Sequence, residues 1–252
     1  RYGSKFESWA GSSFAEVYAD SAIAPNGQLE ARLVVPPNAV GAKFFTDNTV
    51  SSNSGDTYTA SVYAKSAGHR YVQLIFGSGA YGATKWATFD LQTGSVDANG
   101  LTASSAENVG KGWYRLSITG TATSSSASSA FVAFVGTATA ARNAAHVGDD
   151  FSGVLIWGYQ YEKGSAASSL VNSGTSSSGV TRAADSCSVA VSDFAGFADT
   201  EGAVIAEATV NSLNSGNAAA VSLQNAAGTE YIKIGYEIGG ATDQSVRTYV
   251  RS

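Results

Sequence analysis

The stretches TYTASVYAK at residues 57–65 and WYRLSIT at residues 113–119 decide the fold class. Apolar and polar side chains alternate along both, and successive side chains of a β-strand point to opposite faces of the sheet. The apolar face carries Tyr58, Ala60, Val62 and Ala64 in the first stretch and Tyr114, Leu116 and Ile118 in the second. Both stretches are therefore predicted to be strands with one face turned into a core.

The same two-residue period recurs along most of the first 163 residues. Further strands are predicted at residues 14–19, 29–35, 42–45, 71–76, 85–91, 103–109, 130–136 and 154–162. Turn-forming runs of Gly, Pro, Asn and Ser separate them, and no segment longer than about ten residues shows the 3.6-residue apolar period of a helix. Short strands with frequent turns predict an all-β fold, an antiparallel jelly-roll sandwich.

A Ser- and Gly-rich stretch divides the chain. Residues 164–179 read GSAASSLVNSGTSSSG, which is typical of a flexible or loosely draped connection. We predict a first domain at residues 1–163, a linker at 164–180 and a second domain at 181–252, with strands at 189–191, 203–210, 219–224, 231–237 and 245–250. A sandwich needs roughly 100 residues. We therefore expect a second, smaller or incomplete β-sandwich, and a chain that is a fragment of a longer polypeptide.

Composition excludes several classes of protein. Hydrophobic residues make up 44% of the chain, enough for a packed core and too many for a disordered Ser-rich tract. The net charge of −5 disfavours a nucleic-acid partner, which usually requires a basic stripe. No run of about 18 apolar residues is present, so no membrane insertion is predicted. Cys187 is the only cysteine, which rules out an intrachain disulfide and a cysteine-based zinc cluster.

The motifs that carry catalytic chemistry are incomplete. Residues 77–82 (GSGAYG) match the glycine pattern of a dinucleotide-binding loop, but a strand-like stretch follows them, so a glycine-rich hairpin is predicted. His69 and His146 lie far apart in the sequence beside glycines, and we predict exposed surface residues and no zinc site. The pair Asp149-Asp150 is predicted to be solvated or to hold a local calcium. No G-x-S-x-G elbow occurs, and an enzyme is not predicted.

Aromatic residues in the polar register of two predicted strands are a stronger indication. Trp86 shares a face with Thr88 and Asp90, while Tyr71 and Gln73 share the face opposite Val72 and Leu74. A sheet face with rings and polar groups is suited to a pyranose, which offers an apolar CH face and a rim of hydroxyls. The glycan contacts predicted on this basis are Trp86, Tyr71, Gln73 and Arg70. The alternative is that these aromatic residues pack against a loop, the linker or a neighbouring subunit.

An ordered series of short motifs resembles a module that recurs in bacteriophage tail proteins. The series consists of residues 110–115 (GKGWYR), 155–164 (LIWGYQYEKG) and 180–185 (VTRAAD). The resemblance covers most of residues 1–185 and implies a carbohydrate-binding-module-like jelly roll carried on tail fibres and other virion surface proteins. Residues 186–252 are similar to the opening half of a concanavalin A-like lectin domain, which commonly follows the VTRAAD motif.

The resemblance also bears on metals. Related jelly rolls often hold a structural calcium near the turn that residues 24–27 (APNG) match. The typical aspartate of this turn is Asn26 here, and Glu30 stands near the second acidic position. The change from aspartate to asparagine argues against the calcium site, so no metal ligand is assigned and no other cofactor is expected.

Two functions follow from the resemblance. The first is a non-enzymatic receptor-binding module of a tail fibre, a homotrimer on the virion surface that attaches to host cell-surface polysaccharide and contacts other virion proteins. The alternative is a structural decoration or head-fibre protein that docks on other virion proteins without binding sugar. A depolymerase is least favoured, because it requires two carboxylates about 5–10 Å apart in a groove. The host, the glycan and the place on the virion stay open.

Overall fold

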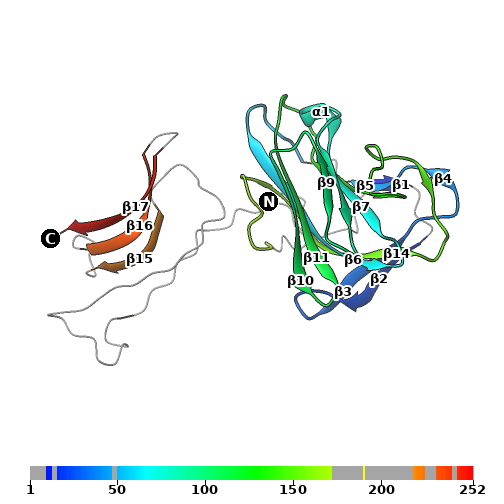
Figure 1. The fold of residues 1–252 in the computed structure, drawn as a ribbon, viewed down its shortest axis with the longest axis horizontal. Coiled ribbons are helices and arrows are strands. Elements are labelled where there is room, and N and C mark those ends of the chain that lie inside the picture. Colours follow the sequence, from blue (N-terminus) through cyan, green and yellow to red (C-terminus); the bar gives the residue numbers. More distant parts are fainter. Residues whose placement is uncertain are drawn as a thin grey trace. The chain divides into compact units, whose positions relative to one another are not determined.

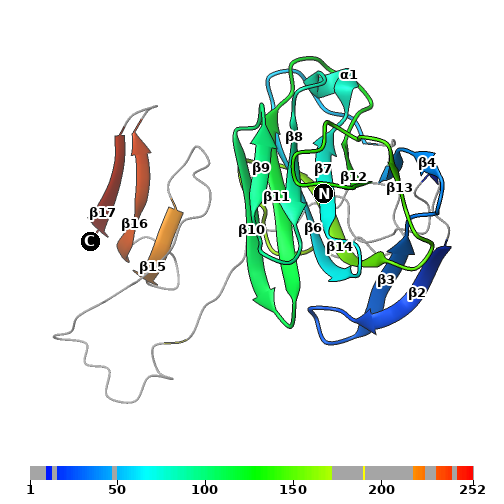
Figure 2. The same ribbon diagram turned by 45° about the vertical axis from the view of Figure 1, so that its right-hand side comes forward.

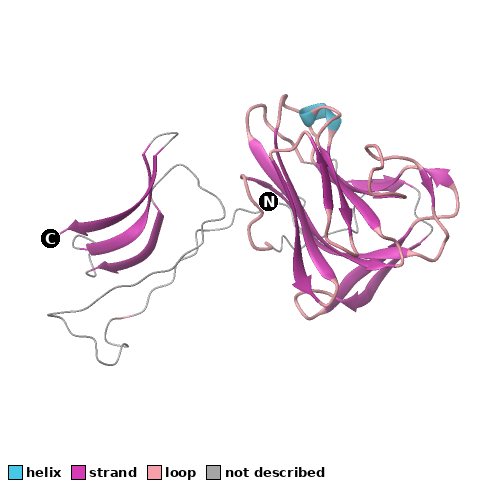
Figure 3. Ribbon diagram, viewed as in Figure 1, coloured by secondary structure: helices cyan, strands magenta, loops and turns pink. Residues whose placement is uncertain are grey.

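The computed structural model contains two compact units, residues Arg1–Arg182 and Ala183–Ser252. It describes residues 10–12, 16–46, 50–171, 190, 218–224, 231–239 and 243–251. Nearly all regular structure in these ranges is antiparallel β-sheet, which confirms the predicted all-β class. Figure 3 shows the single short helix of the described residues among the strands. No helix in the described part of the chain is long and apolar enough to cross a bilayer.

The first unit is a sandwich of two six-stranded sheets (Figures 1 and 2). Sheet I has the order β1 (Ala10–Ser12), β5 (Lys43–Thr46), β12 (Ala130–Val135), β7 (Tyr71–Phe76), β8 (Trp86–Asp90) and β9 (Val96–Asn99). Sheet II has the order β10 (Ala103–Gly110), β11 (Trp113–Thr121), β6 (Thr57–Ala67), β14 (Gly153–Lys163), β3 (Leu29–Val35) and β2 (Glu16–Ile23). Strands β4 (Val40–Gly41) and β13 (His146–Val147) form a separate pair.

The strand order is that of a jelly roll. The four central strands of each sheet form the jelly roll. In chain order these eight strands are β3, β5, β6, β7, β8, β11, β12 and β14. In sheet II the neighbouring strands are β11, β6, β14 and β3, which are the sixth, third, eighth and first of the eight. In sheet I the neighbouring strands are β5, β12, β7 and β8, which are the second, seventh, fourth and fifth. The chain thus crosses repeatedly from one sheet to the other, so the two inner faces are formed together.

The core lies between the inner faces and follows the predicted alternation. Tyr58, Val62 and Ala64 of β6 are buried, and Tyr114 lies beside Ala64 across the β11–β6 pair. Sheet I contributes mainly Val72, Leu74, Phe76, Ala87, Phe89, Val132 and Phe134. Large apolar side chains from both sheets therefore form one continuous cluster, which is the principal stabilising feature of the unit.

Most predicted strands are present with shifts of one or two residues at their ends, but four short strands were missed. These are β1, β4, β9 and β13, which have two to four residues each. Such strands are too short for an alternating pattern to be recognised. The predicted glycine-rich hairpin does join β7 to β8, yet it contains one helical turn, α1 (Ser78–Tyr81). A Cβ atom at Gly77 would lie 2.0 Å from Ser128 Oγ, so glycine there permits the close approach of two loops.

The first residues of the predicted linker form hydrogen bonds with sheet II. Ser168 donates hydrogen bonds from its backbone N and its Oγ to the Glu162 carboxylate, both at 2.8 Å. Its carbonyl oxygen accepts a hydrogen bond from Arg115, and Val171 N donates to Gln160 Oε1 at 2.8 Å. Residues 164–171, called the covering segment below, therefore pack on sheet II. The rest of the predicted linker, 172–180, lies outside the described residues.

The second unit contains an antiparallel three-stranded sheet in its described part. Its strands are β15 (Ala218–Gln224), β16 (Tyr231–Gly239) and β17 (Asp243–Arg251), in that order. They match the last three predicted strands, since the alternation in each is long enough to recognise. The predicted strand at 203–210 lies outside the described residues, as does most of the one at 189–191.

Candidate functional site

The outer face of sheet I carries the residues predicted to bind a glycan. Across the β7–β8 pair, Tyr71 lies opposite Asp90, Gln73 opposite Thr88, and Ile75 opposite Trp86. Directly opposed residues share a face, so the predicted common face of Tyr71, Gln73 and Trp86 is correct. Trp86 and Tyr71 nevertheless lie at opposite ends of the pair, roughly 13 Å apart along the strands at about 3.3 Å per residue.

Gln73, between these ends, is not a surface residue. Its exposed fraction is 0%, because residues 136–152, called the crossing loop below, run over it. Its Nε2 donates to Thr88 Oγ1 at 3.0 Å and to the carbonyls of Ala140 and Ala141 at 3.1 and 3.2 Å. Its Oε1 accepts the N–H of Asn143 at 2.8 Å. Gln73 therefore anchors the crossing loop, which divides the outer face of sheet I into two clefts.

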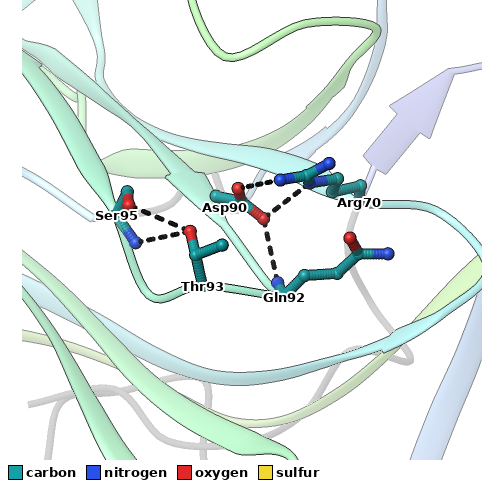
Figure 4. Close-up of polar contacts among 5 residues, drawn as sticks. All are labelled: Arg70, Asp90, Gln92, Thr93 and Ser95. Atoms are coloured by element: carbon teal, nitrogen blue, oxygen red, sulfur yellow. Dashed lines mark hydrogen bonds and ion pairs between the residues drawn. The ribbon is translucent and has the colours of Figure 1, made fainter.

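Arg70 is already committed to an intramolecular ion pair (Figure 4). Its Nε and Nη2 bind the two carboxylate oxygens of Asp90 at 2.9 and 2.6 Å, a bidentate geometry. Asp90 also accepts the N–H of Gln92, and Thr93 binds Ser95 in the following turn. The Arg70 guanidinium holds the pKa of Asp90 well below its ordinary value. Arg70 also lies over the Tyr71 ring, 5.1 Å from its centroid, so it orders this end of the sheet.

The first cleft, called the histidine cleft, has a volume of about 270 Å³. Its lining includes Arg70, Tyr71, His69, His146, Asp149 and Ser152. The rings of His69 and His146 are 5.4 Å apart, and both side chains are partly buried, so the prediction of two separate exposed histidines is wrong. The crossing loop brings them together from positions that are distant in the sequence.

Burial and local hydrogen bonds set the protonation states of two residues in the histidine cleft. Burial lowers the pKa of His146 to about 4, with further lowering by His69 and Lys43, so this imidazole is neutral at neutral pH. Asp149 accepts hydrogen bonds from Ser152 Oγ and from the N–H groups of Phe151 and Ser152, which lower its pKa to about 2. These bonds make Asp149 a turn-forming residue. In the described part of the chain no three histidine, cysteine or acidic side chains gather as a metal site.

The second cleft, called the arginine cleft, lies at the Trp86 end of the sheet and has a volume of about 370 Å³. It is lined by Phe44, Phe131 and Arg142 and by residues 77–79 and 126–129, which include four serines. The rings of Phe44 and Phe131 are 5.4 Å apart, and Arg142 lies 5.4 Å from the Phe131 centroid. Its Nη2 donates to the Phe76 carbonyl at 3.2 Å, whereas its Nε is buried without a partner.

Trp86 lies in the same row of side chains as Phe131. Ile75 is opposite Trp86 on one side and opposite Phe131 on the other. With strands about 4.8 Å apart, the two aromatic residues are separated by roughly 10 Å on one face. Trp86 is partly exposed and does not line the cleft, and Ile75, which lies between Trp86 and Phe131, is fully buried.

Sequence reasoning missed the arginine cleft. Phe131 lies in an entirely apolar strand whose two faces cannot be told apart by alternation, and Arg142 is the only charged residue between Val135 and His146. A single cation in an alanine-rich loop is the signal that was available. The pattern did not reveal that this loop lies across sheet I, because that contact joins residues about 70 positions apart in the sequence.

The outer face of sheet II is closed. Trp113 and Trp157 are buried there with Ala24 and Ala31, and Leu170 of the covering segment packs against them. For these two tryptophans the alternative interpretation is correct: they pack against the segment that was predicted to be a linker. Trp113, predicted to face outward, does so and is buried on that side. Trp9 lies outside the described residues.

The residues that the resemblance connects with calcium do not fit that ion. Glu30 Oε2 accepts hydrogen bonds from Asn26 Nδ2 at 2.9 Å and from Trp157 Nε1 at 3.1 Å. Asn26 Oδ1 accepts the N–H of Gln28 at 3.0 Å. Calcium requires several oxygen ligands around it, whereas here N–H donors occupy the oxygens. In the described residues these hydrogen bonds connect the turn to Trp157 of β14.

Comparisons with known proteins assign no family to this chain. No family model matches the sequence, and a search of curated proteins finds no relative.

Proposed function

We propose that the first unit is a non-enzymatic glycan-binding module of a bacteriophage virion-surface protein, such as a tail fibre, that attaches the particle to host cell-surface polysaccharide. The observation that carries the proposal is the arginine cleft, where two aromatic rings, a guanidinium and several serines line one hollow on a rigid sheet. The motif series that resembles phage tail modules supplies the biological setting of the proposal.

The chemistry of the cleft supports a sugar ligand. Phe44 and Phe131 offer ring surface for the CH face of a pyranose, and Trp86 lies in the same row of side chains as Phe131. Serines at 78, 126, 128 and 129 and the guanidinium of Arg142 supply polar groups in its lining. A mixture of apolar walls with a few placed polar groups is typical of ligand sites.

The lining residues of the two clefts do not favour hydrolysis of a glycan. Glycosidases commonly use two carboxyl groups across the scissile bond. The arginine cleft has no acidic lining residue, and the histidine cleft has only Asp149, whose oxygens already bind a neighbouring turn. The described clefts therefore favour binding over bond cleavage.

The proposal includes repetition of the site. One shallow cleft for a single sugar binds weakly, whereas several copies on a homotrimer raise the overall affinity through effective concentration. We propose a trimer at the virion surface, outside the host cell, with other virion proteins as further partners.

A second candidate is a structural decoration or head-fibre role without sugar binding. The hairpin of β2 and β3 favours it, because four large apolar side chains on this hairpin are about half exposed. They are Val17, Tyr18, Ile23 and Leu29. Val17 and Tyr18 are consecutive in β2 and point to opposite faces, so exposed apolar side chains are present on both faces, and such surface marks protein–protein contacts in many proteins.

Binding to a panel of host-surface polysaccharides tests the first candidate against the second. We expect saturable binding that is lost in Trp86→Ala and in Phe131→Ala. Tyr18→Ala is the matched control, since Tyr18 is an aromatic residue of 50% exposure on the other sheet. Circular dichroism establishes that each variant is folded.

The structural role predicts a different result in the same experiment. If the folded oligomer binds no polysaccharide, attaches to purified virions, and loses that attachment in Tyr18→Ala, the structural role replaces the adhesive one.

A further inference from the structure

We propose that the arginine cleft binds the carboxylate of an acidic saccharide, such as a uronic or sialic acid unit, and that Arg142 is the residue that selects it. This inference rests on the proposed glycan-binding function and narrows the class of sugar.

Arg142 is a cation without a counter-ion. No acidic side chain lines the arginine cleft, and no ion pair of Arg142 occurs among the described residues. An arginine stays protonated at neutral pH, and a partly buried charge without an opposite charge carries a desolvation cost. An anion in the cleft would remove that cost by forming a charge-assisted hydrogen bond with the guanidinium.

The hydrogen bonds of Arg142 also leave capacity for a ligand. Nη2 donates to the Phe76 carbonyl at 3.2 Å, and the buried Nε has no partner. Arg115 has a similarly unpaired Nε, but its Nη2 binds the Ser168 carbonyl of the covering segment, and it lines neither cleft. Of the arginines that line the two clefts, Arg70 is paired with Asp90, and Arg142 has no acidic partner among the described residues.

The neighbours of Arg142 indicate a sugar acid in preference to a bare anion. The guanidinium lies over Phe131, whose ring contacts Phe44, so an anion at Arg142 lies next to apolar surface. A small inorganic ion leaves that surface unused, whereas a pyranose carboxylate places its ring there. The cleft volume of about 370 Å³ is in the lower part of the range for small-molecule sites, which suits one sugar unit.

The overall charge of the chain makes this preference distinguishable from general attraction to polyanions. The net charge is −5, so the protein as a whole repels an acidic polymer. Affinity for a carboxylated glycan must therefore come from a local site.

The experiment compares acidic polysaccharides with their own carboxyl-reduced forms. Polygalacturonate, alginate and polysialic acid are the carboxylated probes, and dextran sulfate detects unspecific polyanion binding. The full chain is titrated with each polymer as wild type, as Arg142→Gln and as Arg142→Lys. Lys111→Gln is the control, because it removes one exposed positive charge from the turn between β10 and β11.

We expect wild type to bind at least one carboxylated polymer about tenfold more tightly than its reduced form, the gain of roughly one charge-assisted ion pair. Arg142→Gln removes this preference, so that the carboxylated and reduced forms bind with equal affinity, Arg142→Lys restores part of it, and Lys111→Gln has no effect. The thermal unfolding midpoint of Arg142→Gln should match wild type.

Two results would overturn the inference. Equal affinity for the carboxylated and reduced polymers, or a preference that survives Arg142→Gln or extends to dextran sulfate, rejects the carboxylate site and leaves glycan binding intact. Absence of binding to every polymer, reduced or not, rejects the glycan-binding function together with it.

Discussion

The outer faces of the two sheets carry similar side chains but differ in how far later segments of the chain cover them. Each carries aromatic and polar side chains in the outward register, and each is crossed by a later part of the chain. On sheet II the covering segment lies over Trp113, Trp157 and Glu162 and buries them. On sheet I the crossing loop is anchored at Gln73 and leaves a cleft at each end.

The difference shows that an outward-facing aromatic residue is not evidence of a binding surface by itself. Trp113 and Trp86 both occupy outward positions of a strand, yet Trp113 belongs to a second core and Trp86 stays partly exposed. The two tryptophans differ because a later segment of the chain packs on Trp113 and none buries Trp86. Variants that remove either cover, or the residues below it, test this comparison.

The largest effect is expected from Trp113→Ala. Removing a buried tryptophan from beneath the covering segment costs the transfer free energy of the ring and leaves a cavity, about 3–5 kcal/mol in free energy of unfolding. Denaturant unfolding of the first unit measures it, with Trp86→Ala as the matched partly exposed tryptophan. If both variants lose the same stability, the two faces do not differ as described.

Gln73→Leu should detach the crossing loop. It leaves the carbonyls of Ala140 and Ala141 and the N–H of Asn143 without partners, at a cost of about 2–3 kcal/mol. Hydrogen exchange should rise in residues 136–152 and stay unchanged in 164–171. Equal exchange in both segments would show that Gln73 is not the local anchor.

Glu162→Ala is the reciprocal change on sheet II. It removes the acceptor of the Ser168 N–H, the Ser168 hydroxyl and the Gln160 amide, and we expect a loss of about 2 kcal/mol. Limited proteolysis should then cut within residues 164–171. The adjacent change Lys163→Ala breaks only a surface ion pair with Asp56, which contributes little to stability because solvent screens it, and should leave the segment protected.

The last prediction is a pH dependence that comes from the crossing loop over sheet I and develops only in acid. The pKa of His146 is about 4 in the folded protein against 6.5 ordinarily, so the unfolded chain takes up the proton first as the pH falls. The contribution to stability is complete above about pH 6.5 and declines from there to about pH 4. The free energy of unfolding of His146→Phe should decline less over this interval, and parallel curves for wild type and variant would contradict the assignment.

Local patterns predicted the strands because they act over a few residues. The alternation in TYTASVYAK and WYRLSIT identified β6 and β11 and their inward faces, and the bounds of β3 and β7 were predicted to the residue. The same reasoning found β15, β16 and β17. The candidate site was predicted only in part: Tyr71, Gln73 and Trp86 do share one face, while Gln73 is a buried anchor and Arg70 is paired with Asp90.

The sequence by itself determined that this protein is an all-β chain with one face of each long strand in a core, because side-chain alternation and turn residues are local properties. Only the tertiary structure decided which outward residues are covered. It brought His69 to His146, Arg142 to Phe131 and Ser168 to Glu162. The contacts of the crossing loop depend on where the jelly-roll connections place segments far apart in the chain, and no short-range period records that placement.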